Sequence, residues 1–110
     1  MVDDDVLDRS YAALADPTRR ALLVALRRGD ARITDLAAPF SMTFAGVSRH
    51  IGVLEDAGLV RRVVRGREHW VSVRPGGLRH AERWIAEQRA FWSKRSDALA
   101  ARLERKRRTP

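Results

Sequence analysis

The sequence from Ser41 to Leu59, SMTFAGVSRHIGVLEDAGL, has the pattern of one amphipathic helix with a signal at each end. Three apolar residues fall at i, i+4, i+7 and so share one face of a helix: Val47, Ile51 and Leu54. The hydroxyl of Thr43 can cap the first turn, and Gly58 can adopt the left-handed conformation that ends a helix. We therefore expect a helix from Thr43 to Ala57 that is anchored along one face.

The other sides of this helix carry small, polar and aromatic side chains. They are Phe44, Ala45, Ser48, Arg49 and His50. Several of these side chains donate hydrogen bonds, and none of them is needed for the apolar face. One side of the helix is therefore expected to pack on a core, while the other is free to contact a partner.

The sequence before this helix predicts a second helix joined to it by a short turn. Thr34 is expected to cap a short helix that stops near Pro39, because the residue before a proline is displaced from helical geometry. The connection over residues 40–42 is then brief. Two helices joined in this way, the second with exposed polar side chains, form the pattern of a helix-turn-helix. The same spacing also fits an αα-hairpin in a small helical domain.

A basic β-hairpin is predicted directly after the main helix. Residues 60–75, VRRVVRGREHWVSVRP, contain two runs of β-branched and aromatic residues, and Gly66 can supply the positive φ of the turn between them. Four arginines fall within seven residues: Arg61, Arg62, Arg65 and Arg67. A charged hairpin is often only a solvated sheet edge. A basic hairpin that follows the second helix of a helix-turn-helix is, however, also typical of a wing, a hairpin that contacts the DNA backbone. We favour DNA contact.

Further helices are predicted towards both ends of the chain. The first covers residues 3–15, with apolar side chains at i, i+4, i+7: Leu7, Tyr11 and Leu14. Asp16 and Pro17 suit the cap and the first turn of a second helix over about 17–28. A last helix is expected over about 78–103, and at ~1.5 Å rise per residue it would extend beyond a core of this size.

The apolar residues of the last helix recur at spacings near seven. They are Trp84, Ile85, Phe91, Trp92, Leu99 and Leu103. They could form intramolecular core under the first helix, or they could pair two copies of the chain. We favour a homodimer formed by the first and last helices, because the aromatic content exceeds what one small core needs. The predicted interface consists of Leu7, Tyr11, Trp84, Phe91, Trp92 and Leu99.

Length and charge limit the class of protein. A chain of 110 residues has room for one domain, and its net charge of +8 favours a polyanionic partner. Four aspartates precede the first basic residue, so residues 9–110 hold 22 basic and 10 acidic side chains, a net charge of +12. All but two of the basic residues are arginine, whose planar fork suits phosphate and guanine edges.

Several classes of function are disfavoured. The chain has no cysteine, so disulfides, thiolate metal sites and thiol redox sensing are excluded. No Gly-rich phosphate loop or paired-carboxylate motif is present, and the three histidines fall in separate predicted elements, so we expect no enzyme and no cofactor. No apolar run approaches the ~20 residues that span a bilayer, which predicts no membrane contact and a cytoplasmic protein.

Three stretches together resemble the ArsR/SmtB family of bacterial winged-helix repressors. They are ALADPTRRALLVAL at 13–26, FSMTFAGVSRHIGVLEDAGLV at 40–60 and RRVVRGREHWVSV at 61–73, and the likeness runs over most of the chain. The resemblance implies a homodimer whose two recognition helices enter successive major grooves of a palindromic operator, roughly 34 Å apart.

The resemblance also implies which residues contact DNA. On the recognition helix these are Thr43, Phe44, Ala45, Ser48, Arg49 and His50; on the hairpin they are Arg61, Arg65 and Arg67, the last two at the wing tip. Arginine can fork onto guanine or bridge phosphates, serine can bond a phosphate or a base edge, and the methyl groups of Thr43 and Ala45 suit thymine.

The sequence departs from the members of the family that sense metals. Where thiolate sensors carry paired cysteines, residues 34–38 are TDLAA and offer a single carboxylate. His80 and Glu82 are two residues apart on a helix, so they point to different sides and cannot converge on one ion. Residues 90–104, AFWSKRSDALAARLE, are instead similar to a metal-free subgroup often encoded beside small lipid-binding-fold proteins related to Hsp90 ATPase activators. No effector is assigned.

These observations predict a mainly helical winged helix-turn-helix with one β-hairpin. Residues 1–104 form the DNA-binding and dimerisation domain, and residues 105–110 form a basic, disordered tail. The predicted function is a sequence-specific, double-stranded DNA-binding transcriptional regulator, acting as a homodimeric repressor of its own operon on a palindromic operator. The alternative is a protein- or RNA-interaction module that uses the aromatic last helix and the basic surface.

Overall fold

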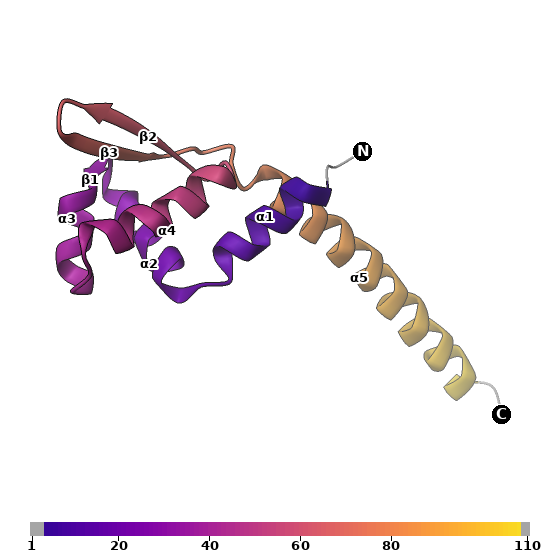
Figure 1. The fold of residues 1–110 in the computed structure, drawn as a ribbon. Coiled ribbons are helices and arrows are strands. Elements are labelled where there is room, and N and C mark those ends of the chain that lie inside the picture. The colour runs from indigo at the N-terminus through magenta and orange to yellow at the C-terminus, as the bar shows by residue number, and fades with distance from the viewer. Residues whose placement is uncertain (1–3, 109–110) are drawn as a thin grey trace. The chain divides into compact units, whose positions relative to one another are not determined.

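The computed structural model describes residues 4–108, and the chain divides into two compact units (Figure 1). The first unit, called the body below, ends at His80, and the second is the remainder of the last helix. The elements in chain order are α1 (Asp4–Leu14), α2 (Pro17–Ala25), the 3-10 turn η1 (Leu26–Arg28), β1 (Ala31–Arg32), α3 (Ile33–Ala37), the 3-10 turn η2 (Ala38–Phe40), α4 (Phe44–Asp56), β2 (Val60–Arg65), β3 (Glu68–Val73) and α5 (Arg79–Arg108). The predicted mainly helical fold with a hairpin is confirmed.

The body contains one antiparallel sheet of three strands in the order β1-β3-β2. β2 and β3 form the predicted hairpin, and Gly66 takes a φ of +63° in its turn. The third strand was not predicted. It consists of Ala31 and Arg32, which pair with β3 on the side away from β2.

The core of the body is built from the helices and one face of the sheet. The largest fully buried apolar side chains are Leu22, Ile33, Val47, Ile51, Leu54, Leu59, Val60 and Val71. Three of these lie on α4, at 47, 51 and 54, and each is 0% exposed, so the predicted core face of this helix is confirmed. Full burial of such a side chain contributes about 1.5–3 kcal/mol, which fastens α4 to the body.

The predicted ends of α4 are also confirmed. The hydroxyl of Thr43 accepts a hydrogen bond from the backbone N–H of Gly46 at 3.1 Å, and Gly58 has a φ of +74°. The helix itself runs from Phe44 to Asp56, one residue inside the expected bounds at each end.

The predicted cap of the preceding helix is wrong. α3 begins at Ile33, so Thr34 lies inside the helix, and the capping position is occupied by Arg32, which has no side-chain cap hydrogen bond. Arg32 is extended because it belongs to β1, and its guanidinium bonds the carboxylate of Asp35 with 2.9 Å between Nε and Oδ2. The strand therefore sets the start of the helix, in place of a hydroxyl cap.

The corner between α1 and α2 is held from both sides. Asp16 caps α2 as predicted, since its Oδ1 accepts hydrogen bonds from the backbone N–H groups of Thr18 at 2.8 Å and Arg19 at 3.1 Å. Arg19 and Arg20 donate in the opposite direction, to the last carbonyls of α1. The bonded carbonyl oxygens are those of Ala12 at 3.0 Å, Ala13 at 2.8 Å and Leu14 at 2.7 Å. Carbonyls at a helix end lack intrahelical partners, so the segment DPTRR satisfies two helix ends at once.

The last helix is longer than predicted. α5 runs to Arg108 instead of ending near Leu103, so the disorder expected for residues 105–110 is wrong for 105–108; Thr109 and Pro110 lie outside the described residues. Arginine, lysine and glutamate are good helix formers, and cations stabilise a helix C-terminus. Arg108 also lies 3.4 Å from the carboxylate of Glu104 one turn earlier. None of the helices that the structure describes could cross a membrane.

Candidate nucleic-acid interface

The recognition helix α4 has one side that faces away from the core. Thr43, Ala45 and Arg49 are exposed there, and no ion pair is found between Arg49 and any described residue. Because the hydroxyl of Thr43 is engaged as the helix cap, its methyl group is what remains for apolar contact. Ala45 and Arg49 are four residues apart, so they lie on the same side of the helix.

A second side of α4 contacts the hairpin. Ser48 is half-buried, and Arg62 of β2 donates two hydrogen bonds to it: Nη1 to the Ser48 hydroxyl at 2.8 Å and Nη2 to the Ser48 carbonyl at 2.9 Å. Arg62 Nε also lies 3.7 Å from Oε1 of Glu55. The Ser48 hydroxyl, which was predicted to contact DNA, is therefore already an acceptor for Arg62, and it keeps its own proton to donate.

Phe44 makes a second contact with the hairpin, near the start of α4. Its ring meets the imidazole of His69 edge to face, with centroids 5.3 Å apart and an interplanar angle of 78°. Phe44 remains 41% exposed. Phe44 therefore packs on β3 and still presents apolar surface beside the exposed side of α4 that carries Ala45 and Arg49.

His50 contacts the corner between α1 and α2. Its Nδ1 lies 3.3 Å from Nη1 of Arg19, the same guanidinium that bonds the end of α1. A guanidinium can only donate, so Nδ1 is the acceptor in this contact, which leaves Nε2 for another partner. His50 is half-buried, so its Nε2 is the part that the predicted DNA contact would use.

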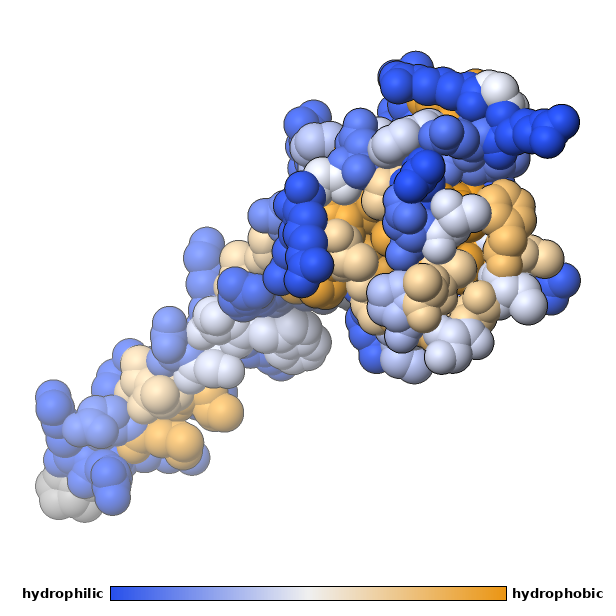
Figure 2. Space-filling model, turned by 90° about the vertical axis from the view of Figure 1, so that its left-hand side faces the viewer, coloured by the Kyte–Doolittle hydropathy of each residue, from blue (hydrophilic) through white to orange (hydrophobic). Residues whose placement is uncertain are grey.

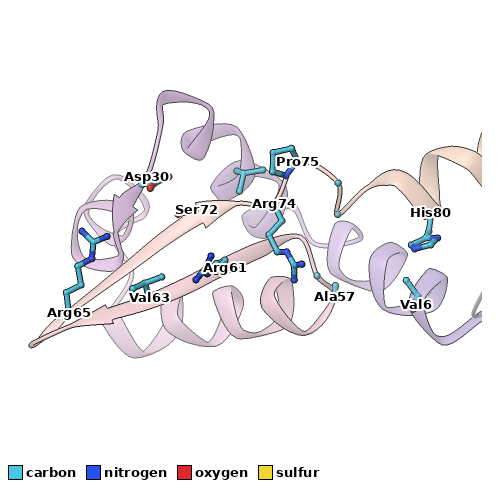
Figure 3. A pocket seen from close by; sticks show the side chains of 14 residues that line it. Val6, Asp30, Ala57, Arg61, Val63, Arg65, Ser72, Arg74, Pro75 and His80 are labelled. Carbon is cyan, nitrogen blue, oxygen red and sulfur yellow. The ribbon is translucent and has the colours of Figure 1, made fainter.

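The hairpin divides its arginines between two faces, because successive residues of a strand point to opposite sides. Arg62 lies on the face towards α4, whereas Arg61 and Arg65 line an open cleft of about 870 Å³ on the other face, together with Arg74 (Figure 3). Arg67 is exposed in the turn next to Gly66. The predicted wing residues are therefore exposed, and Arg62, counted with them in the sequence, is held against the helix.

The predicted dimer residues differ in exposure between the two units. In the body, Leu7 is buried and Tyr11 is half-buried. In α5 the predicted residues are exposed: Trp84 42%, Phe91 55%, Trp92 57% and Leu99 57%. Figure 2 shows apolar patches in orange exposed along this helix among hydrophilic side chains. Phe91 and Trp92 contact each other edge to face at 5.1 Å, so they form one aromatic cluster.

No group of three or more metal-ligating side chains is found within residues 4–108. Arg19 and Arg62 were missed as residues that organise the site. For Arg62 a signal was available, because strand alternation places it with Val60 and Val64 and apart from Arg61 and Arg65. For Arg19 no local pattern indicates that it reaches α4, 31 residues further along the chain.

A helix-turn-helix followed by a basic hairpin is a winged helix-turn-helix, and this fold and this surface define a DNA-binding protein. Residues 14–63 match a family model described as a helix-turn-helix domain. The matched segment runs from the end of α1 into the hairpin and contains the whole of α4.

Two curated relatives are transcriptional regulators. The transcriptional repressor SdpR of Bacillus subtilis is 27% identical over 79 residues, which cover 72% of this chain and 88% of SdpR. The HTH-type transcriptional regulator CmtR of Mycobacterium tuberculosis is 42% identical over 65 residues, which cover 59% of this chain and 55% of CmtR. The chain thus spans most of the first relative and about half of the second.

Two solved structures are similar over most of this chain. A crystal structure of an ArsR family transcriptional regulator is 38% identical, with a TM-score of 0.79, and the alignment covers 84% of this chain and 95% of that one. A homodimeric winged helix-turn-helix DNA-binding domain from Mycobacterium bovis, 22% identical with a TM-score of 0.63 over 76% of this chain and 80% of that one, has the same fold. The chain belongs to the ArsR family of transcriptional regulators. It is a DNA-binding regulator and not an enzyme.

Proposed function

We propose that the chain is a homodimeric repressor that binds a palindromic operator upstream of its own operon. The observation that carries the proposal is the exposed Arg49 of α4, beside a hairpin whose tip arginines, Arg65 and Arg67, are also exposed. In a symmetric dimer, two copies of α4 would enter successive major grooves about 34 Å apart. Repression follows because a dimer on the operator blocks the promoter, and SdpR, a relative, is named a repressor.

Within this surface we assign different roles to different residues. Arg49 and Ala45 are proposed to read base edges, since they are exposed on one side of α4. Thr43 and Phe44 add apolar contact near the start of the helix, and Ser48 and His50 donate their remaining protons to the duplex. Three hairpin arginines are proposed to contact phosphates: Arg61, Arg65 and Arg67.

The homodimer is proposed to form through the exposed apolar residues of α5, with α1. Support comes from an aromatic cluster that is more than half exposed in the single chain and from the homodimeric state of the similar winged-helix domain. We further propose that the protein acts in the cytoplasm and belongs to the metal-free subgroup, which is supported by the lack of cysteine in the chain.

The rival function is a protein- or RNA-interaction module. The two are separated by measuring the affinity for a duplex from the region upstream of its own gene, and for a scrambled duplex, over a range of salt concentrations. A repressor is expected to bind the upstream duplex at least ~10³-fold more tightly at physiological salt. Equal affinity for both duplexes would contradict the sequence-specific function.

The wing is tested with the pair Arg65→Ala and Arg67→Ala. Loss of two phosphate contacts in each protomer, four in the proposed dimer, should weaken binding to every duplex and make the plot of log affinity against log salt shallower by about 3–4. The control removes the same charge elsewhere in the body, at Arg27 and Arg28, which are exposed in η1. An unchanged slope in the wing variant would mean that the hairpin does not lie on the backbone.

A further inference from the structure

One of the four hairpin arginines has an environment that the other three lack. The side chain of Arg62 is only 16% exposed, although it carries a full charge and lies on the edge strand β2. Its guanidinium lies across α4, where it bonds both the hydroxyl and the carbonyl of Ser48 and lies near the carboxylate of Glu55. A buried charge is costly unless it is paired and hydrogen-bonded. The two Nη atoms of Arg62 are hydrogen-bonded, whereas its buried Nε has no hydrogen-bond partner among the described residues and lies 3.7 Å from the Glu55 carboxylate.

The contacts between the hairpin and α4 are spread along the helix. Phe44 contacts His69 of β3 near the first turn, Ser48 bonds Arg62 one turn later, and Glu55 lies beyond it. Arg62 also passes beside Gly52, where a Cβ would lie at an ordinary contact distance of 4.0 Å from Nη2. The hairpin is therefore attached to the helix at more than one point and cannot pivot about a single contact.

We infer that Arg62 is a positioning residue that fixes the wing relative to the recognition helix. The inference rests on the proposed function, since it concerns how α4 and the hairpin engage one duplex together. The two parallel N–H donors of a guanidinium define an orientation as well as a distance, which the single ammonium of lysine cannot do. Arg62 thereby sets where the tip arginines lie when Arg49 is in the major groove.

A fixed wing makes the two sets of DNA contacts cooperative. Once α4 is docked, the hairpin arginines are already held near the phosphates, so their binding is effectively intramolecular. If the hairpin could rotate on α4, the same arginines would have to be ordered during binding, and part of their contribution would be lost. Arg62 should therefore change how much the wing contributes, without being a wing contact itself.

The test compares the effect of the wing variant in two backgrounds. Operator affinity is measured for the full chain, for Arg62→Lys, for Arg65→Ala with Arg67→Ala, and for all three substitutions together. Arg62→Lys keeps the charge, so long-range attraction to DNA is unchanged. We expect the tip substitutions to cost at least ~3-fold less affinity in the Arg62→Lys background than in the wild-type background. Arg20→Lys, which changes a guanidinium bonded to the Leu14 carbonyl at the end of α1, is the matched control and should leave that cost unchanged.

A purely structural role for Arg62 would lower the folded fraction and would weaken binding equally with and without the tip arginines. Equal costs in the two backgrounds would therefore overturn the inference, as would tip substitutions that cost nothing in the wild type. If Arg62→Lys does not fold, Ser48→Ala removes one of the two acceptors, and the same comparison is made in that background with the same criterion. The proposed function fails separately, if the wild-type chain does not prefer the upstream duplex.

Discussion

The body and α5 carry apolar residues at the same helical spacing but expose them to opposite extents. In α4 of the body, Val47, Ile51 and Leu54 are each 0% exposed. In α5, six large apolar residues are between 42% and 57% exposed: Trp84, Ile85, Phe91, Trp92, Leu99 and Leu103. Periodicity therefore identifies which face of a helix is apolar, and it does not identify what covers that face.

The two units differ in whether their apolar faces are covered within the chain. The body covers its own apolar face with α2, α3 and the sheet, and its helix ends are closed by side chains such as Asp16 and Thr43. α5 leaves an apolar stripe at the surface, and such a stripe marks an interaction site more often than a solvated face. The body is thus expected to be stable as a single copy, whereas the stripe of α5 is the surface that we propose a second chain covers.

The largest effect is expected from a substitution that creates a cavity in the core of the body. Ile51→Ala removes a fully buried side chain from α4 and should lower the free energy of unfolding by about 2–5 kcal/mol, measured by urea denaturation. The matched substitution in α5 is Leu99→Ala, made in a monomeric background such as Trp92→Glu. Because Leu99 is exposed in the single chain, its change should stay below about 0.5 kcal/mol. If Ile51→Ala and Leu99→Ala lowered the free energy of unfolding by similar amounts, α5 would have to be covered within its own chain.

The second prediction concerns the dimer. Trp92→Glu places a charge in the aromatic cluster of α5 and should raise the dimer dissociation constant by at least ~30-fold, because a buried interface does not tolerate an unpaired carboxylate. Light scattering over a concentration series measures this. Ser93→Glu adds the same charge at the next, exposed position and should leave the dimer intact. A dimer that persists in Trp92→Glu would remove Trp92 from the interface.

The sequence predicted the features that depend on neighbours three or four residues away. The core face of α4, its Thr43 cap and its Gly58 end all follow from local spacing, as does Asp16 at the start of α2. β1 could not be predicted in this way, since Ala31 and Arg32 form a strand only because β3 offers them an unpaired edge. The wrong cap at Thr34 has the same cause, because that distant pairing decides where α3 begins.

At the candidate site, local patterns predict which side chains are exposed and do not predict their contacts. Exposure of Arg49 and of the tip arginines follows from the amphipathic helix and from the turn. The contact of His50 with Arg19 joins residues 31 positions apart, and no local pattern indicates it. For Arg62, strand alternation indicates the face of the hairpin but does not identify Ser48, 14 positions away, as the partner. The sequence shows the chemistry of these polar side chains, whereas the fold divides them into those that contact the body and those that are exposed.

The smallest expected effect lies within the body, at the corner that Asp16 closes. The hydrogen bond from the backbone N–H of Arg19 is the largest cause that lowers the pKa of Asp16 below its ordinary value of 3.8. A carboxylate whose pKa is lower in the folded chain stabilises the fold above the unfolded pKa, and this stabilisation is lost as the pH falls through the folded pKa. Asp16→Asn keeps a capping oxygen and removes the charge. The melting temperature of the wild type should therefore exceed that of Asp16→Asn at pH 6, and the difference should shrink steadily as the pH is lowered below about 4. A difference that stayed constant down to pH 2 would mean that the charge of Asp16 does not contribute and that the cap acts through its geometry alone.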